Sequence, residues 1–201
     1  MTGIAYASGT STVPLLGQTI GENLEATAAR FPDQEALVVP FQKIRLTYAQ
    51  LDAEVDRLAR GLLALGVERG DRVGIWSPNN AEWVIVQYAT AKIGAILVNL
   101  NPAYRTSEVQ YALAQSGCRL LVAATDFKSS DYRSMIDEVR GGLPELERTV
   151  FLGTPDWDEL LAGGEAIPGG RWPTGPRRSA STTRSTSSTP AGRPASRRAP
   201  R

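Results

Sequence analysis

Short, almost wholly apolar runs alternate with helical patterns through the middle of the chain. The runs at 72–76, 95–100, 118–124 and 148–152 have the length of strands and contain few charged residues. Strands that are apolar on both faces are typical of parallel sheets, because helices cover both sides of such a sheet. The pattern therefore predicts an α/β fold with a mostly parallel sheet flanked by helices.

Helix signals occupy the segments between and before these runs. Thr19 and Thr47 each stand three residues before a Glu or Gln, which is the spacing of a capping box, so a helix is expected after each. The second of these has an apolar residue at every third or fourth position and ends near Gly66, where a left-handed cap is expected. Further helices are expected from Asn79 or Asn80 to Gly94, from 106 to 117 and from 130 to 140. A hairpin is expected over 35–46.

Composition excludes several kinds of chemistry. The 201 residues include no histidine, which rules out Ser-His-Asp and Cys-His catalysis and His-ligated zinc. The single cysteine, Cys118, cannot form an internal disulfide, which favours a cytoplasmic location. No apolar run is long enough to span a membrane, and residues 1–17 have no secretory-signal pattern, so we expect them to be a flexible leader.

The end of the chain differs from the rest in charge and composition. All 21 acidic residues lie at or before Glu165, whereas eight arginines follow it. Residues 166–201 are rich in Arg, Ser, Thr, Pro and Gly and have almost no large apolar side chains, so we expect a disordered tail. A basic tail of this kind favours weak, salt-sensitive nucleic-acid binding, and no specific nucleic-acid motif is present.

Three segments resemble one enzyme family. They are Leu-Thr-Tyr-Ala-Gln-Leu at 46–51, Gly-Asp-Arg-Val at 70–73 followed by Ser-Pro-Asn, and the run Ala-Lys-Ile-Gly-Ala-Ile-Leu-Val-Asn-Leu-Asn-Pro at 91–102. In this order they resemble the adenylate-forming, or AMP-binding, superfamily. The stretch from Asn101 to Arg105, with Glu108 after it, is similar to the fatty-acid branch, the AMP-forming acyl-CoA synthetases. The resemblance covers roughly 18–165.

The resemblance implies a reaction in two halves. ATP and a carboxylate, here a fatty acid, give an acyl-adenylate and pyrophosphate, and coenzyme A then displaces AMP. The resemblance also implies that residues 18–165 are the N-terminal portion of a synthetase domain. The family's phosphate loop, its Mg²⁺ carboxylate and its catalytic lysine belong to later sequence. We therefore assign no catalytic, cofactor-binding or metal-binding residue within this chain, and ATP, Mg²⁺ and CoA are implied for the intact family only.

The arginine-rich tail suggests a frameshift. If the proper frame begins one base earlier, residues 190–201 can encode Thr-Ser-Gly-Thr-Thr-Gly-Phe-Pro-Lys-Gly-Ala-Thr, which resembles the family's phosphate loop. A slip between about Glu165 and Pro176 would have turned that loop into the tail. The alternative is a chance fit in a GC-rich gene, because third bases are free. The expected product is a truncated synthetase that is inactive alone.

Several side chains invite a functional interpretation, and for each we favour a structural one. Cys118 is expected in the core rather than as a nucleophile, and Lys92 as a solvated helix charge rather than a phosphate ligand. Asn101 follows a strand end, where open α/β sheets bind ligands, but a turn role is favoured. Asn99 and Tyr104 lie at the same strand end as Asn101. The remaining candidates are Tyr48, Trp76 and Trp83, expected in the core or an interface rather than in an acyl pocket, and Asp52, Glu54 and Asp56, expected on a solvated face.

Two functions are therefore favoured, and a complete small enzyme of this type is a less favoured third. The first is the truncated synthetase, and the second is a non-catalytic interaction module with a weakly nucleic-acid-binding tail. Whether the chain is an enzyme at all stays open at this point. In either case a sheet that lacks its later strands exposes an edge and apolar surface, which predicts marginal stability and aggregation.

Overall fold

Four parallel strands form the central sheet of the computed structural model, which describes residues 16–167. The strands are β3 (Arg72–Trp76), β4 (Ile96–Leu100), β5 (Leu120–Ala123) and β8 (Arg148–Phe151). Their order is β4-β3-β5-β8, so β3 is central and the chain adds strands first on one side of it and then on the other. The predicted parallel sheet is confirmed.

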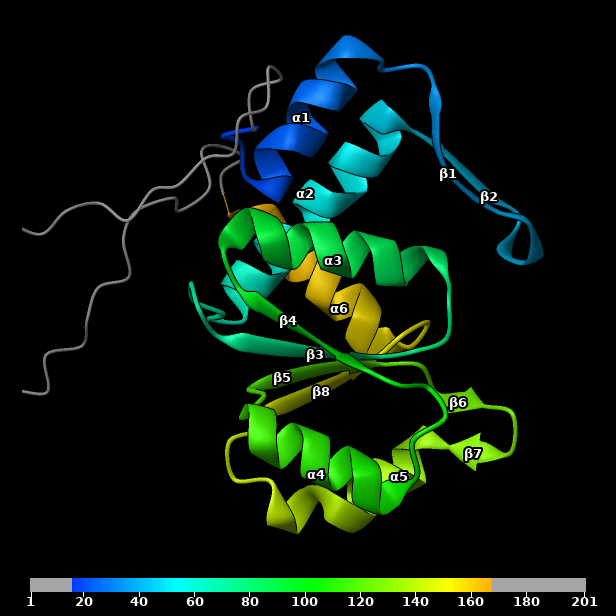
Figure 1. Cartoon of the computed structure of the whole chain (residues 1–201), viewed down its shortest axis with the longest axis vertical. Helices are drawn as coiled ribbons and strands as arrows, with labels where there is room; N and C mark the ends of the chain where they lie inside the picture. Colours follow the sequence, from blue (N-terminus) through cyan, green and yellow to red (C-terminus); the bar gives the residue numbers. More distant parts are fainter. Residues whose placement is uncertain (1–15, 168–201) are drawn as a thin grey trace, which may run out of the picture.

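Helices cover both faces of this sheet (Figure 1). Those on one face are α2 (Tyr48–Ala64), α3 (Ala81–Ile93) and α6 (Pro155–Gly163), and α1 (Ile20–Arg30) packs on α2 and α3. Those on the other face are α4 (Thr106–Ser116) and α5 (Tyr132–Val139). Each layer has its own apolar core, one centred on Leu58, Leu62 and Ile75, and the other on Trp76, Leu113 and Leu121. The three-layer arrangement therefore follows from strands that are apolar on both sides.

Local capping fixes where the helices begin. Thr19 and Thr47 both form complete capping boxes, so both sequence signals are confirmed. Asn80 caps α3 through a hydrogen bond to its side-chain oxygen from the N–H of Trp83 at 2.8 Å. Gly66 has a φ of +80°, the left-handed conformation expected after α2.

A short antiparallel hairpin projects from the helical layer, as the sequence predicts. It consists of β1 (Glu35–Val39), η1 (Pro40–Gln42) and β2 (Ile44–Thr47). The Gln42 side chain holds the hairpin against α3, because it accepts the N–H of Ala81 at 2.7 Å and donates to Glu82 at 2.8 Å. The hairpin thus also helps to cap the start of α3.

Some elements were not predicted from the sequence. α6 and the two-residue strands β6 (Asp126–Phe127) and β7 (Ser130–Asp131) have no counterpart in the prediction, and α5 begins two residues later than expected. The turns η2 (Arg140–Gly142) and η3 (Gly164–Ala166) complete the described part. The predicted tail at 166–201 and leader at 1–17 lie almost entirely outside the described residues. No helix within residues 16–167 is long and apolar enough to cross a membrane.

Candidate functional site

Two aromatic side chains fill the carboxyl edge of the sheet, where open α/β folds bind ligands. Trp76 ends β3 and stacks on Tyr132 from the start of α5, with ring centroids 3.5 Å apart and planes at 7°. The Trp76 indole N–H donates to the Asn101 carbonyl at 3.0 Å, and the Tyr132 hydroxyl donates to the Pro102 carbonyl at 2.6 Å. Both rings are fully buried. They hold the turn after β4 against the sheet.

The Tyr132 hydroxyl acts as a hydrogen-bond donor rather than a titrating group. Burial raises the pKa of Tyr132 to about 12, and the negative charge of Asp126 adds to this effect. The hydroxyl therefore stays protonated at neutral pH. This is the state that its hydrogen bond to the Pro102 carbonyl requires.

Asn101 has the turn role that the sequence predicts. Its side-chain oxygen accepts the N–H of Ala103 at 2.9 Å, and its carbonyl accepts the N–H of Tyr104 at 3.0 Å. These bonds are those of an Asn-initiated turn, and they use the acceptor groups that a ligand would otherwise meet. Asn99 is exposed on β4.

A shallow hollow of about 360 Å³ lies on the outer face of α4. The residues that line it are Tyr104, Ser107, Glu108, Tyr111, Ala112 and Gln115. The sequence analysis did not predict this hollow. The only sequence signal for it is that its lining residues on α4 are three or four positions apart and so share one helix face. Tyr111 is 65% exposed at its rim. The hollow contains only one charged side chain, that of Glu108, which does not suit an anionic ligand.

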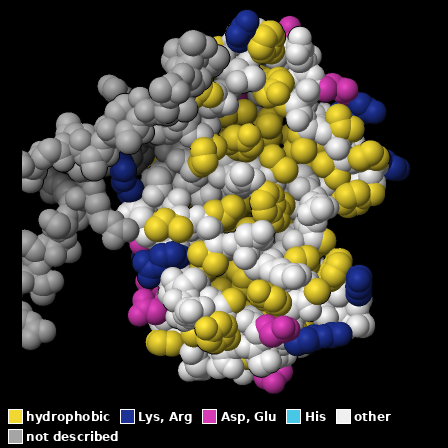
Figure 2. Space-filling model, in the orientation of Figure 1, with side chains coloured by type: hydrophobic (Ala, Val, Ile, Leu, Met, Phe, Trp, Pro, Cys, Tyr) yellow, Lys and Arg dark blue, Asp and Glu magenta, His cyan; other side chains and the backbone are white. Residues whose placement is uncertain are grey.

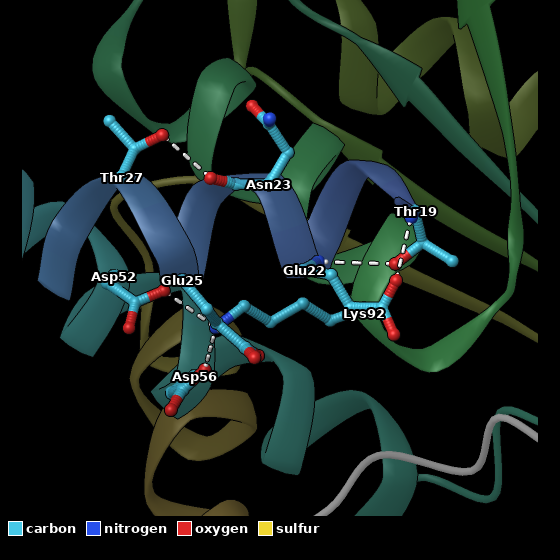
Figure 3. Close-up of polar contacts among 8 residues, drawn as sticks. All are labelled: Thr19, Glu22, Asn23, Glu25, Thr27, Asp52, Asp56 and Lys92. Atoms are coloured by element: carbon cyan, nitrogen blue, oxygen red, sulfur yellow. Dashed lines mark hydrogen bonds and ion pairs between the residues drawn. The ribbon is translucent and has the colours of Figure 1, made fainter. Parts of the chain in front are cut away.

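Lys92 lies at the centre of an ion cluster between three helices (Figure 3). Its side chain extends from α3 and is 0% exposed. The amine is 2.7 Å from Asp52 and 3.2 Å from Glu25, and it also contacts Asp56. Glu25 belongs to α1, and the two aspartates are one turn apart on α2. The cluster therefore ties three helices together.

This cluster corrects two expectations from the sequence. Lys92 is not a solvated helix charge, and Asp52 and Asp56 are not on a freely solvated face, since their side chains are 24% and 33% exposed and bonded to the amine. The cause is the packing of α2 on α3, which places opposite charges from distant segments together. Glu54 is closer to the expectation, since its side chain is 42% exposed and 3.8 Å from Arg57.

The cluster does not suit a phosphate group. Burial favours a neutral amine, but the hydrogen bonds to Asp52 and Asp56 outweigh it and raise the pKa of Lys92. Burial raises the pKa of Asp56, and the contact with Lys92 offsets only part of that shift. Three carboxylates surround the amine, so a phosphate there would meet more negative than positive charge. The residues of this ion cluster thus do not fit the triphosphate that the family resemblance implies.

The other candidates lie where the structural interpretation places them. Cys118 is buried, and its burial raises the pKa of the thiol, so the side chain stays protonated and unreactive. Tyr48 and Trp83 pack against the core of the larger helical layer while remaining partly exposed. No group of three or more His, Cys, Asp or Glu residues within 16–167 is arranged to hold a metal ion.

Comparison with known proteins gives consistent results. Residues 24–187 match the family model described as "AMP-binding enzyme". The medium-chain acyl-CoA ligase ACSF2, mitochondrial, of Rattus norvegicus is 47% identical over 146 residues, which is 73% of this chain and 23% of the relative. The Homo sapiens protein of the same name is 45% identical over 145 residues, again 23% of its length. This chain therefore spans about a quarter of the length of these curated relatives.

Solved structures agree with the sequence matches. The N-terminal domain of FACL13 from Mycobacterium tuberculosis superimposes with a TM-score of 0.66 at 28% identity, covering 77% of this chain and 38% of that domain. The anthranilate CoA ligase AuaEII, solved with anthranoyl-AMP, gives a TM-score of 0.67 at 25% identity, covering 79% of this chain and 30% of that one.

Proposed function

Because this chain belongs to the AMP-binding enzyme family, we propose that residues 18–165 are the N-terminal portion of an AMP-forming acyl-CoA synthetase and that the chain alone does not catalyse the reaction. The observation that carries the first part is the 47% identity over 146 residues to a medium-chain acyl-CoA ligase. For the intact synthetase we propose the same substrate class, a medium-chain fatty acid with ATP and CoA. The cytoplasmic location stays a prediction, and the relatives just described are named as mitochondrial proteins.

The charge arrangement of the described residues supports the second part of the proposal. A triphosphate needs converging N–H groups and free positive charge. Lys92 is saturated by three carboxylates. At the carboxyl edge of the sheet, Trp76 and Tyr132 fill the space and direct their donors to main-chain carbonyls. This arrangement supports the proposal that the residues that receive ATP lie outside residues 18–165.

We expect the purified 201-residue chain to show no specific ATP binding by calorimetry. With ATP, Mg²⁺, CoA and medium-chain fatty acids, we also expect no pyrophosphate release above the protein-free rate. The intact rat relative, assayed in parallel, is the positive control for the reagents. Saturable ATP binding or turnover by this chain would contradict the inactivity, while leaving its family membership untouched.

A frameshift explains how a synthetase sequence acquires an arginine-rich end. The predicted reading of residues 190–201 in the neighbouring frame contains a Gly-Thr-Thr-Gly-x-Pro-Lys-Gly loop, downstream of the portion 18–165 that resembles the family. The family-model match runs on to residue 187, so the end of the alignment does not locate the slip. These residues lie outside the part of the chain that the structure describes.

The coding sequence tests the frameshift directly. We expect that a reading displaced by one base downstream of about codon 165 yields the phosphate-loop sequence and continues as synthetase sequence. Resequencing the genomic locus distinguishes a true frameshift from an error in the recorded bases. A displaced reading without this loop would reject the frameshift, and the origin of the tail would then need another explanation.

A further inference from the structure

α1 is attached to the rest of the described fold by few apolar contacts. It packs on α2 and α3, and its buried residues are Gly21, Leu24 and Ala28, of which only Leu24 has a large side chain. Ile20 and Phe31, at the two ends of the helix, are 58% and 37% exposed. Figure 2 shows hydrophobic side chains open to the surface on this side of the molecule, at the level of α1 and α3. α1 is therefore held less firmly than a helix of the core.

The segment after α1 gives the helix a fixed end about which it can open. The N–H of Tyr48 donates to the Gln34 carbonyl at 2.9 Å. The N–H of Ala49 donates to the Pro32 carbonyl at 3.1 Å, so this segment is joined to the start of α2. The other end of α1 has its own complete capping box at Thr19. The helix can therefore leave α2 and α3 as one unit while the sheet stays folded.

The docking of α1 brings a third carboxylate to the buried amine of the ion cluster. Lys92 of α3 contacts Asp52 and Asp56 of α2, and two negative charges with one positive charge give these three groups a net charge of −1. Glu25 of α1 lies 3.2 Å from the same amine, and its charge takes the net charge of the docked cluster to −2. The docked helix therefore adds negative charge to a group of side chains that is already negative.

The charges that matter for this contact belong to the cluster itself. The largest charge effects on Asp56 come from Lys92 on α3, Asp52 on α2 and Glu25 on α1. Glu22 of α1 accepts the N–H of its own N-cap residue at 2.8 Å. The acidic side chains of α6 and η3, which also pack on α2, are exposed; they are Asp156, Asp158, Glu159 and Glu165. The electrostatics of α1 docking thus depend on the four groups of the ion cluster.

We propose that the docking of α1 on α2 and α3 is linked to the uptake of one proton by the ion cluster, so that α1 opens more readily as pH rises. In the open state Asp52 and Asp56 are hydrated, and both stay ionised beside the amine. In the docked state the loss of water and the charge of Glu25 favour the neutral form of one carboxyl group. Burial raises the pKa of Asp56 above the ordinary value of 3.8, so Asp56 is the favoured acceptor of the proton. A raised carboxyl pKa stabilises the docked state at low pH, and this contribution is lost as pH rises through the docked-state pKa.

Hydrogen exchange followed by mass spectrometry on the full chain measures the opening of α1. An isolated helix of 11 residues is marginal in water, so the amides of α1 lose protection when the helix opens. The protection factor is the intrinsic exchange rate divided by the measured rate, which removes the direct effect of pH on exchange. We expect the protection factor of α1 to fall about threefold or more between about pH 5 and about pH 7.5, while β3 and β5 stay protected.

Variants of single carboxylates test which groups carry the proton. Asp56→Asn keeps an oxygen facing Lys92 and cannot titrate, so its α1 protection is expected to be independent of pH and above the wild-type value at pH of about 7.5. Glu54→Gln is the matched control on the same helix, because Glu54 faces Arg57 outside the cluster, and it is expected to keep the wild-type pH dependence. Glu25→Gln changes a carboxylate that is 43% exposed, so it is expected to fold normally and to flatten the pH dependence.

Gly21→Ala tests whether α1 is a separable unit. A Cβ at position 21 would lie 2.9 Å from Cγ and 3.2 Å from Cα of Lys92, so α1 has to move away from α3. Alanine forms helices better than glycine, so the helix itself is not weakened. We expect the protection factor of α1 to fall about tenfold at each pH, while α2 and the sheet keep their protection.

Three outcomes would overturn the proposal. The first is an α1 protection factor in the wild-type chain that is constant or rises between about pH 5 and about pH 7.5. The second is the same pH dependence in Asp56→Asn, Glu25→Gln and Glu54→Gln, which would assign the proton to groups outside the cluster. The third is a loss of α1 protection in Gly21→Ala that occurs only together with loss in β3 and β5, because α1 would then not open by itself.

Discussion

Replacing Lys92 by methionine is expected to lower the free energy of unfolding by about 2–4 kcal/mol at neutral pH. The amine is fully buried, and its removal leaves Glu25, Asp52 and Asp56 facing one another without a positive charge. The expected loss extends below the usual range for broken buried ion pairs, because the carboxylates are 24–43% exposed and partly hydrated. Urea titrations followed by circular dichroism measure the difference.

The pH dependence separates this charge effect from simple loss of packing. The pKa of Asp56 is already raised in the folded chain by burial, and loss of Lys92 removes the contacts that lower it. A raised carboxyl pKa gives a contribution to stability that is present at low pH and is lost as pH rises through the folded-state pKa. The deficit of Lys92→Met is therefore expected to be largest near pH 7 and to shrink toward pH 4.

Two further variants make this prediction sharp. Arg57→Met, on the helix α2 that carries the two aspartates, breaks only the exposed contact with Glu54 at 3.8 Å, so its effect is expected to stay below about 1 kcal/mol. Adding Asp52→Asn and Asp56→Asn to Lys92→Met removes the repulsion and is expected to recover much of the stability. A deficit that is the same at pH 7 and pH 4, with no recovery in the triple variant, would show that the cluster contributes through packing alone.

Gly61→Ala is expected to detach α6 from α2 and to cost about 2–4 kcal/mol. A Cβ at position 61 would lie 2.2 Å from the main-chain oxygen of Leu160, a contact that no side-chain rotation relieves. The helices can respond only by moving apart, which exposes the buried side chains of Trp157, Leu160 and Leu161. The unfolding midpoint in urea and the rate of proteolytic cleavage within α6 measure the effect.

Gly141→Ala is the matched control for this prediction. A Cβ at position 141 meets nothing within 4 Å, and the glycine has no left-handed backbone conformation. Its effect is expected to lie within about 0.5 kcal/mol of zero. Equal stability of Gly61→Ala and Gly141→Ala would mean that the close approach of α2 and α6 is not needed for the fold.

Much of this fold could be predicted because its determinants are local. The capping boxes at Thr19 and Thr47 and the left-handed glycine at 66 each depend on a few neighbouring residues. The same holds for the turn at Asn101. The parallel sheet follows from strands that are apolar on both faces. The sequence pattern did not predict α6, although Pro155 and Asp156 at its start are helix signals, because a helix of 9 residues is too short to show a clear apolar period.

The ion cluster around Lys92 could not be predicted in the same way. Lys92 stands 36 and 40 residues from its two aspartates, and each of these residues is polar on an otherwise ordinary helix. Only the packing of α2 on α3 brings them together, and sequence periodicity carries no information about that pairing. The stacking of Trp76 on Tyr132 was likewise invisible, since two aromatic residues 56 positions apart give no joint signal.

The strand order also has a consequence for synthesis on the ribosome. Within the central sheet, β3 and β4 are synthesised first. The two later strands, β5 and β8, add on the side of β3 that is opposite β4. The β4 edge is therefore complete once residue 100 has left the exit tunnel, and nothing in the remaining described sequence covers it. A growing chain therefore exposes the uncharged edge of β4 throughout the synthesis of the rest of the described sequence.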